Sequence, residues 1–360
     1  MVAKNSFYRI LKSKKSVFET SKISDLFSHV DKERVDRIAE SVSVYIRDNL
    51  PKAFDKRENL ADYRTNPYVL LTSASVLDLD DPARFADFIF NSKFYMALET
   101  SFGKSIESAF VGQYPINSTT HWEEPLEKIA EFKGLEGFTR EEKAQKRVGS
   151  VWREIDKSVV VGDHRYFVTI KSGPNTINDS QVQAMTDAIR NNYKTWINES
   201  KRNNRSVKSI DVVVGLTYGT DKTTNNKENQ ILAKLLDNGF VEEDRERCPG
   251  VLIDRETRTV RVYRKIGIEY WAFMGSPTDP SSAQHVFLEI LLGLSKALSI
   301  GIDRKSVEGG VNKKIRELSM ALSKLQFPQK SLPTWIKNDF SEEELFLLTT
   351  AMTAFYDEGI

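Results

Sequence analysis

A short glycine turn separates two stretches whose polar residues could act together on one substrate. The apolar run Val159–Val161 ends at Gly162-Asp163, and strand-like residues follow from Arg165 to Lys171. Two β-type runs that flank a two-residue loop containing glycine predict a hairpin. The turn then places Val161 opposite His164, which sets the register for both strands.

Counting back from that turn places Asp156 opposite Thr169 and Glu154 opposite Lys171. Because side chains alternate between the two faces of a strand, these four residues are expected to share one face. Directly opposed Cβ atoms lie about 4.5–5.5 Å apart, which is close enough for two oxygen ligands to share one cation. The other face is apolar and carries Tyr166, Val168 and Ile170.

An acid, a hydroxyl and an amine on one face suit phosphodiester hydrolysis. A carboxylate binds Mg²⁺ through one or two oxygens and leaves the remaining positions to water and phosphate. The metal polarises the phosphate and activates water, and a lysine stabilises the added negative charge or positions the water. The alternative is an amphipathic surface ribbon with a Glu154–Lys171 pair, which would contribute only a few tenths of a kcal/mol (about 0.3).

The pattern of Asp156 followed by Thr169-Ile170-Lys171 resembles the Asp…(Asp/Glu)-x-Lys motif of the PD-(D/E)xK nuclease superfamily. The continuation KSGPNTIN, residues 171–178, resembles a group of type II restriction endonucleases that have a similar turn after the catalytic strand. The resemblance implies that Asp156 binds the metal and that Lys171 assists the attacking water. The order of elements fits this group over residues 90–270.

Thr169 departs from the family pattern, because the family has an acid at this position. The resemblance to very-short-patch repair nucleases, which also have threonine there, implies that the backbone carbonyl coordinates the metal. A carboxylate from elsewhere is a second explanation, and a catalytically weakened protein is a third. In the resembling nucleases a glutamate on the helix before the hairpin reaches the metal site. Glu107 matches that position, although an ordinary exposed helix glutamate is the competing interpretation.

Polar and basic residues after the hairpin are candidates for DNA contact. They occur in the turn after the second strand, on a helix predicted to start at Asn178–Asp179, in the polar loop 220–229 and on a basic ribbon within 250–274. Such side chains contact phosphates or read base edges. The candidates are Ser172, Asn175, Asn178, Gln181, Arg190, Lys194, Lys222, Asn225, Asn226, Lys227, Arg261 and Arg264.

Composition indicates the cellular compartment of the protein but not its substrate. The 52 Lys+Arg and 51 Asp+Glu residues give a net charge of +1, which neither favours nor excludes a nucleic acid partner. The one cysteine, Cys248, excludes an internal disulfide framework and a cysteine zinc cluster. The N-terminus lacks the apolar core of a signal peptide, and no run is long enough for a membrane span. These features predict a cytoplasmic protein without a membrane partner.

The chain is expected to adopt an α/β fold, with a mixed central sheet flanked by helices. We expect a helical region over residues 1–92, a nuclease core over 93–275 and a helical region over 276–360 for core closure or dimerisation. Pro51 is expected to end the first long helix, and Asp80-Asp81-Pro82 to start another. The apolar run within 206–218 predicts a buried, parallel strand, and 250–274 shows β patterning with a turn at Asp254–Thr257.

Taken with the resemblance, these features predict a type II restriction endonuclease that uses Mg²⁺. It would cleave double-stranded DNA at a short, palindromic site as a homodimer, and a DNA methyltransferase is its expected genetic partner. A repair or structure-specific nuclease on the same fold and a catalytically weakened DNA-binding protein are the alternatives.

Overall fold

The computed structural model describes residues 25–55, 63, 66–79, 81–105, 122–128, 139, 141–142, 150–173, 176–220, 227–236, 238–244, 246–301, 304–325 and 332–356. The chain forms two compact units. The first comprises the described parts of residues 1–41 and 103–296, and the second those of residues 42–102 and 297–360. The division predicted from sequence, at 92/93 and 275/276, stays a prediction.

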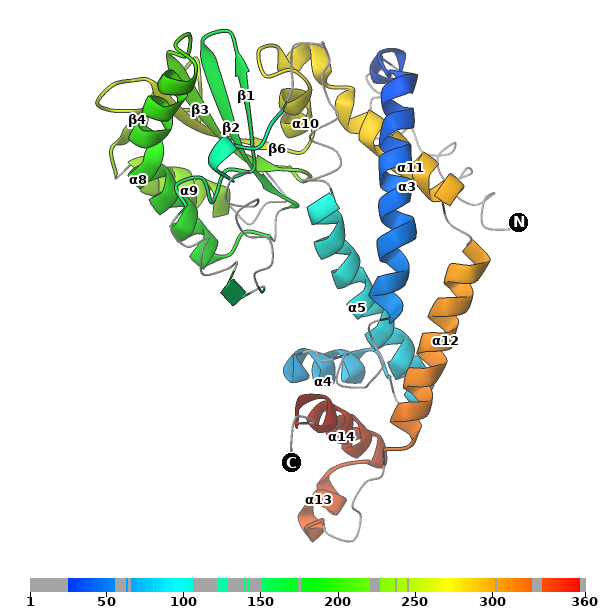
Figure 1. Cartoon of the computed structure of the whole chain (residues 1–360). Helices are drawn as coiled ribbons and strands as arrows, with labels where there is room; N and C mark the ends of the chain where they lie inside the picture. The colour runs from blue at the N-terminus through cyan, green and yellow to red at the C-terminus, as the bar shows by residue number, and fades with distance from the viewer. Residues whose placement is uncertain are drawn as a thin grey trace. The chain divides into compact units, whose positions relative to one another are not determined.

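One mixed sheet of six strands forms the centre of the first unit, in the order β1-β2-β3-β6-β5-β4 (Figure 1). Strands β2, β3 and β6 run parallel to one another, whereas β1, β5 and β4 pair antiparallel with their neighbours. The predicted α/β fold with a mixed sheet is therefore confirmed. The strands are β1 Lys157–Val161, β2 His164–Lys171, β3 Ser209–Leu216, β4 Phe240–Glu242, β5 Leu252–Asp254 and β6 Val260–Ile266.

The β1–β2 hairpin has the register predicted from its turn. Val161 pairs with His164, and the ladder continues regularly back to Lys157, which pairs with Val168. Gly162 has φ of 63°, a left-handed conformation that glycine adopts without steric cost, so the tight turn depends on this residue. The hairpin thereby places residue 156 at the same end of the sheet as the C-terminal end of β2.

Strand β3 lies in the middle of the sheet and pairs parallel with both neighbours, as its unbroken apolar run predicted. Helices α8 (Asp179–Asn203) and α9 (Lys227–Leu236) cover one face of the sheet. Their apolar side chains form one core with β2, β3 and β6, and Trp196 is completely buried there. This packing stabilises the strands that carry the predicted site.

Helix α10 (Ile268–Gly275) lies against the other face, where Phe273 contacts Tyr166 of β2. The prediction of β structure throughout 250–274 was wrong over this segment. Gly267 has φ of 57°, which ends strand β6, and the following apolar residues are buried almost all round rather than on alternating sides. In a run as short as 268–275, the pattern of apolar and polar residues does not separate a strand from a buried helix.

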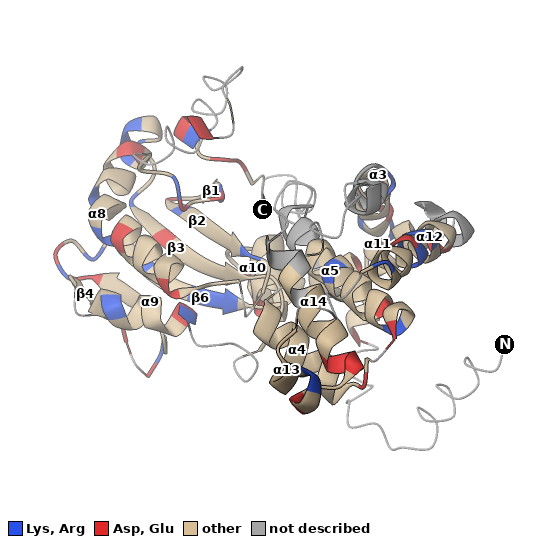
Figure 2. Cartoon of the chain, turned by 90° about the horizontal axis from the view of Figure 1, so that it is seen from below, with Lys and Arg blue, Asp and Glu red and all other residues tan. Residues whose placement is uncertain are grey.

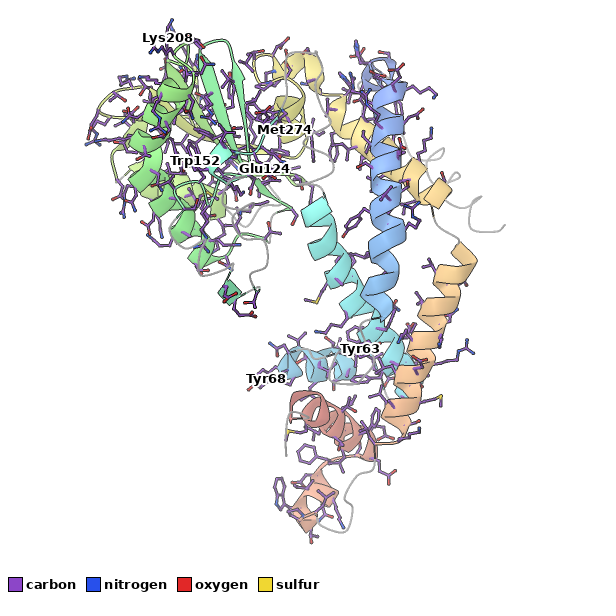
Figure 3. All side chains as sticks on the ribbon, viewed as in Figure 1. Tyr63, Tyr68, Glu124, Trp152, Lys208 and Met274 are labelled. Carbon is purple, nitrogen blue, oxygen red and sulfur yellow. The ribbon has the colours of Figure 1, made fainter. Side chains whose placement is uncertain are left out.

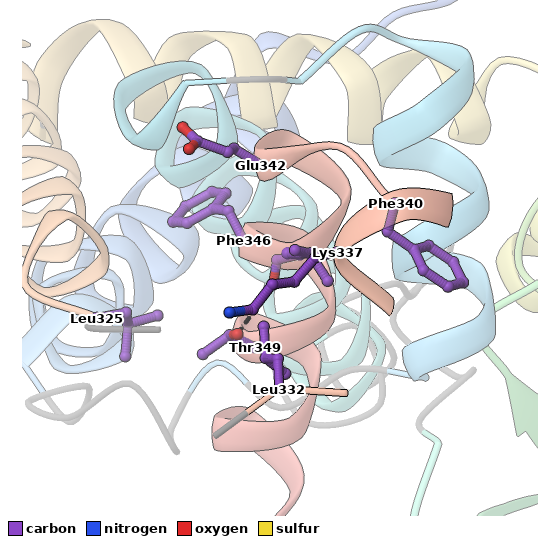
Figure 4. A pocket seen from close by; sticks show the side chains of 8 residues that line it. Leu325, Leu332, Lys337, Phe340, Glu342, Phe346 and Thr349 are labelled. Carbon is purple, nitrogen blue, oxygen red and sulfur yellow. Dashed lines mark hydrogen bonds between the residues drawn. The ribbon is translucent and has the colours of Figure 1, made fainter. Parts of the chain in front are cut away.

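The remaining helices include some that pass from one unit into the other. They are α3 Lys32–Asp55, α4 Pro67–Val76, α5 Pro82–Ser105, the 3₁₀ helix η4 Pro280–Ala283, α11 Val286–Gly301, α12 Arg304–Ser323, α13 Thr334–Asp339 and α14 Glu342–Tyr356. In the second unit α4, α5, α12 and α14 share an apolar core around Phe85 and Phe90. A cavity of about 480 Å³ lies beside this core, lined by Phe346 and Leu325 with Lys337 and Glu342 among the charged residues (Figure 4).

Two helix-boundary predictions had different outcomes. Helix α5 begins at Pro82, and Asp81 caps it by accepting hydrogen bonds from the N–H groups of Ala83 and Arg84, as predicted. The predicted end of a helix at Pro51 was wrong, because α3 continues to Asp55. A proline inside a helix costs about 3 kcal/mol, which the buried apolar face of α3 outweighs. Across the described ranges, no helix combines the length and apolar character needed to cross a bilayer.

Candidate active site

Asp156 lies just before β1 and continues the hydrogen bonding of the hairpin, partly through its side chain. The backbone N–H of Asp156 donates to the carbonyl of Val168 at 2.9 Å, and Val168 is the residue that pairs with Lys157 at the start of β1. Oδ2 of Asp156 accepts the backbone N–H of Ile170 at 2.6 Å. In a regular ladder a backbone carbonyl of the first strand would accept that N–H. The side chain of Asp156 is therefore fixed against β2, next to Thr169.

The strand does not continue back to Glu154, so the predicted pairing of Glu154 with Lys171 was wrong. Residues 151–154 form a turn, in which the N–H of Ile155 donates to the carbonyl of Trp152. Trp152, which Figure 3 labels, is buried and packs against Phe167 and Trp196. The chain turns at residues 151–154 so that this indole ring enters the core. The β1–β2 ladder therefore does not extend back to Glu154.

Thr169 lies inside β2 and is completely buried. Its hydroxyl Oγ1 has no hydrogen-bond partner among the described residues. An unpaired buried hydroxyl is costly and uncommon, which makes it an informative feature of this position. The carbonyl oxygen of Thr169 lies so close to Gly215 of β3 that an added Cβ there would come within 2.7 Å of it. The same Cβ would lie 2.3 Å from the Tyr270 ring of α10, so glycine at position 215 allows both β2 and α10 to lie close to β3.

Lys171 ends β2 and lies two positions after Thr169, on the same face. Its side chain is half-buried and forms no ion pair with any residue that the structure describes. The turn that follows is held by hydroxyl groups: Thr217 donates to the carbonyl of Ser172 at 2.8 Å, and Thr176 to that of Gly173 at 2.6 Å. Lys171 therefore lies at the same end of the hairpin as Asp156, just before this turn.

Lys128 belongs to this site, and sequence reasoning missed it. Its Nζ donates to Oδ1 of Asp156 at 3.0 Å and to the carbonyl of Ile155 at 2.8 Å. Residues 122–128 follow the outer side of β1, where Glu123 and Ser158 exchange two backbone hydrogen bonds. The sequence contained one sign that this segment packs against the protein. Trp122 is a large apolar residue in a polar stretch, and it is buried.

Most cations that were predicted to contact DNA have an acidic partner within the protein. Arg261 donates twice to Glu243, and Arg264 pairs with Glu228, whose side chain is completely buried. These ion pairs reduce the positive charge available to phosphates, although Figure 2 shows basic residues along β6. The other pairs are Arg190–Asp187, Lys194–Glu256 and Lys227–Asp179. Contact of these cations with DNA stays a prediction.

Ser172 lies in the turn after β2, and the other remaining candidates divide between a helix cap and undescribed segments. Asn178 and Gln181 form a reciprocal capping box at the start of α8, so their side chains are engaged in holding the helix end. The prediction that α8 starts at this point is confirmed. Several predicted site residues lie outside the described residues, namely Glu107, Asn175, Lys222, Asn225 and Asn226.

The oxygen atoms at this site fit a hard cation such as Mg²⁺. Asp156 supplies a carboxylate that accepts the N–H of Ile170, and Thr169, the residue before Ile170, has a buried Oγ1 with no partner among the described residues. Carboxylate and neutral oxygen ligands are those that Mg²⁺ prefers. Within the described part of the chain, no group of three or more His, Cys, Asp or Glu side chains is arranged to bind a metal. A metal here would therefore rely on Asp156, threonine oxygens and water, or on a residue outside the described ranges.

Comparison with known protein families connects this geometry to an activity. Residues 129–243 match the family model of type II restriction endonuclease EcoO109I. The matched segment contains Asp156, Thr169 and Lys171 together with strands β1 to β3. No curated protein matches the chain significantly. The family match over residues 129–243, together with the mixed α/β sheet, supports a type II restriction endonuclease domain in this part of the chain.

Proposed function

We propose that this protein hydrolyses double-stranded DNA at a specific short sequence and requires Mg²⁺ to do so. The observation that carries the proposal is the fixed Asp156 carboxylate at the end of the sheet where β2 delivers Lys171, inside the segment that matches a restriction endonuclease family. A cytoplasmic homodimer that cuts a palindromic site, with a DNA methyltransferase as its genetic partner, is part of the proposal.

Each residue would have a distinct role. Asp156 and Thr169 would hold Mg²⁺, with Glu107 as a further ligand. When bound, the ion would polarise the phosphate and supply positive charge to the hydrolysis. The ammonium of Lys171 would donate hydrogen bonds to the attacking water or to the phosphate oxygens, where negative charge develops. The hydrogen bond from Ile170 to Asp156 keeps the carboxylate oriented while these contacts form.

The test is digestion of DNA of known sequence with the full chain and Mg²⁺. We expect discrete fragments whose sequenced ends share one short motif, no cleavage in a chelator, and no cleavage by Asp156→Asn. Asp163→Asn is the matched control, because Asp163 is an aspartate in the turn at the other end of the same hairpin and pairs with Lys208. Wild-type-like fragments from Asp156→Asn would exclude this site.

The threonine at position 169 favours a second candidate, a DNA-binding protein with weakened catalysis. Such a protein retards DNA in a gel without Mg²⁺ and leaves it uncut at every protein concentration. Cutting that appears only in Thr169→Glu would support this candidate, because the change restores the acid of the resembling family. A repair nuclease would instead cut only DNA that contains a lesion, flap or mismatch.

A further inference from the structure

Lys128 occupies a position that the proposed metal would also need. Its Nζ lies 3.0 Å from Oδ1 of Asp156, and both side chains are 19% exposed, so the pair is largely shielded from water. The other carboxylate oxygen, Oδ2, is engaged by the N–H of Ile170. A divalent ion that binds Asp156 therefore meets an oxygen that already has a cationic partner.

The segment that carries Lys128 is held in place by several independent contacts. The indole of Trp122 donates to the carbonyl of Met274 at 2.7 Å, and Glu124 lies 3.6 Å from the ammonium of Lys157. Lys128 itself is anchored by the carbonyl of Ile155. These contacts position the lysine at Asp156, which distinguishes it from a long exposed side chain that meets an acid by chance.

The charges of the described residues support a competition between lysine and metal. Asp156 forms an ion pair with Lys128, and Lys171 ends the strand β2 to which the Asp156 carboxylate is hydrogen-bonded. With threonine at position 169, the acid that the resembling family has there is absent, so this position adds no negative charge. Like charges repel strongly when they are partly buried, so a divalent ion at Asp156 would bind more weakly while Lys128 stays in place.

We propose that Lys128 is a tethered cation that competes with the divalent ion for Oδ1 of Asp156 and sets the metal concentration that the site requires. The inference rests on the proposed function, because it needs a metal site at Asp156. Lys128 acts through Asp156 and is therefore a positioning residue. It lies immediately before the segment that matches the endonuclease family, so the match itself assigns it no role.

The experiment measures binding of Ca²⁺ to the full-length protein by titration calorimetry, without DNA. We expect Lys128→Met to lower the dissociation constant about tenfold, because one charged hydrogen bond no longer has to be displaced. Lys128→Arg keeps the positive charge and should bind Ca²⁺ with a dissociation constant close to that of the wild type. Lys157→Met is the matched control: it removes the neighbouring pair with Glu124 but leaves Lys128 at Asp156.

The outcomes separate the two proposals. An unchanged or higher dissociation constant in Lys128→Met, in a protein whose circular dichroism and melting temperature match the wild type, would overturn the competition. A similar gain in Lys157→Met would also overturn it, because the effect would then come from loosening the segment. If Lys128→Met does not fold, Lys128→Gln replaces it. If Asp156→Asn binds Ca²⁺ as tightly as the wild type, the metal site itself is excluded, and both proposals fail.

Discussion

Two aspartates of the same sheet, Asp254 and Asp156, are both fixed by backbone N–H groups but to very different degrees. Asp254 ends β5 and is completely buried. Its two oxygens accept four backbone N–H groups and a hydroxyl from the turn that follows, at 2.6–3.0 Å. Asp156 accepts one backbone N–H and the ammonium of Lys128, and its side chain is 19% exposed.

The difference indicates which carboxylate can exchange its partners. Four of the five donors of Asp254 belong to the backbone and cannot leave without unfolding the turn, which also holds Arg258 at φ of 53°. One of the two donors of Asp156 is the end of a flexible side chain, which can move when another cation arrives. Saturation by backbone donors therefore marks a structural aspartate, and a partly satisfied carboxylate beside a lysine marks one that is able to bind a ligand.

The largest expected effect is on stability. Asp254→Ala should reduce the free energy of unfolding by about 3–4 kcal/mol, because several buried N–H groups lose their acceptor. Asp156→Ala should cost about 1–2 kcal/mol, since one backbone N–H and one lysine lose their partner. Urea denaturation followed by tryptophan fluorescence measures both. Equal losses in the two variants would remove the distinction between a structural and an exchangeable aspartate.

The next effect concerns Lys171, the lysine at the end of β2. Lys171→Met should reduce the rate of DNA cleavage about 10²-fold or more, because charge stabilisation in the transition state is lost, with little change in melting temperature. Lys208→Met is the control, because Lys208 is 79% exposed and pairs with Asp163 at the opposite end of the hairpin (Figure 3). Comparable cleavage rates in the two variants would show that Lys171 takes no part in DNA hydrolysis.

A smaller effect is expected from pH. Burial acts to raise the pKa of Asp254, but the hydrogen bonds from the Thr257 to Val260 turn outweigh it and hold this pKa below 3.8. The stabilisation is therefore complete above pH 3.8 and is lost as the pH falls through the lower, folded-state pKa. Below pH 3.8 the wild type should lose up to about 1.4 kcal/mol more per pH unit than Asp254→Asn. Parallel pH profiles of unfolding would contradict this expectation.

The smallest expected effect tests the unpaired hydroxyl of Thr169. Thr169→Val should leave stability unchanged or raise it by about 1 kcal/mol, because it removes a buried oxygen that has no partner among the described residues. The same change should weaken Ca²⁺ binding. Thr186→Val is the matched control: its hydroxyl is buried and donates to the carbonyl of Val182, so removing it should not stabilise the protein. A clear loss of stability in Thr169→Val would show that the hydroxyl is satisfied.

The hairpin could be predicted from sequence because its information is local. A two-residue turn with glycine fixes the register over a few residues, and alternation then places Thr169 and Lys171 on one face. The prediction failed at Glu154 because Trp152 is drawn into a core built by α8, whose residues follow later in the chain. The helix at 268–275 was missed for a related reason, since burial on all sides hides periodicity.

The amino-acid sequence by itself determined the α/β class, the hairpin with its register, the buried parallel strand β3 and the capped start of α8. Each depends on turn chemistry, alternation or capping between residues that are close along the chain. Only the tertiary structure decided the partners of the site: Lys128 comes to Asp156 from 28 residues earlier, and predicted DNA-contacting cations such as Lys194 and Arg261 meet acids from other elements. Ion pairs between distant segments leave no local pattern, because they depend on where packing brings two side chains together.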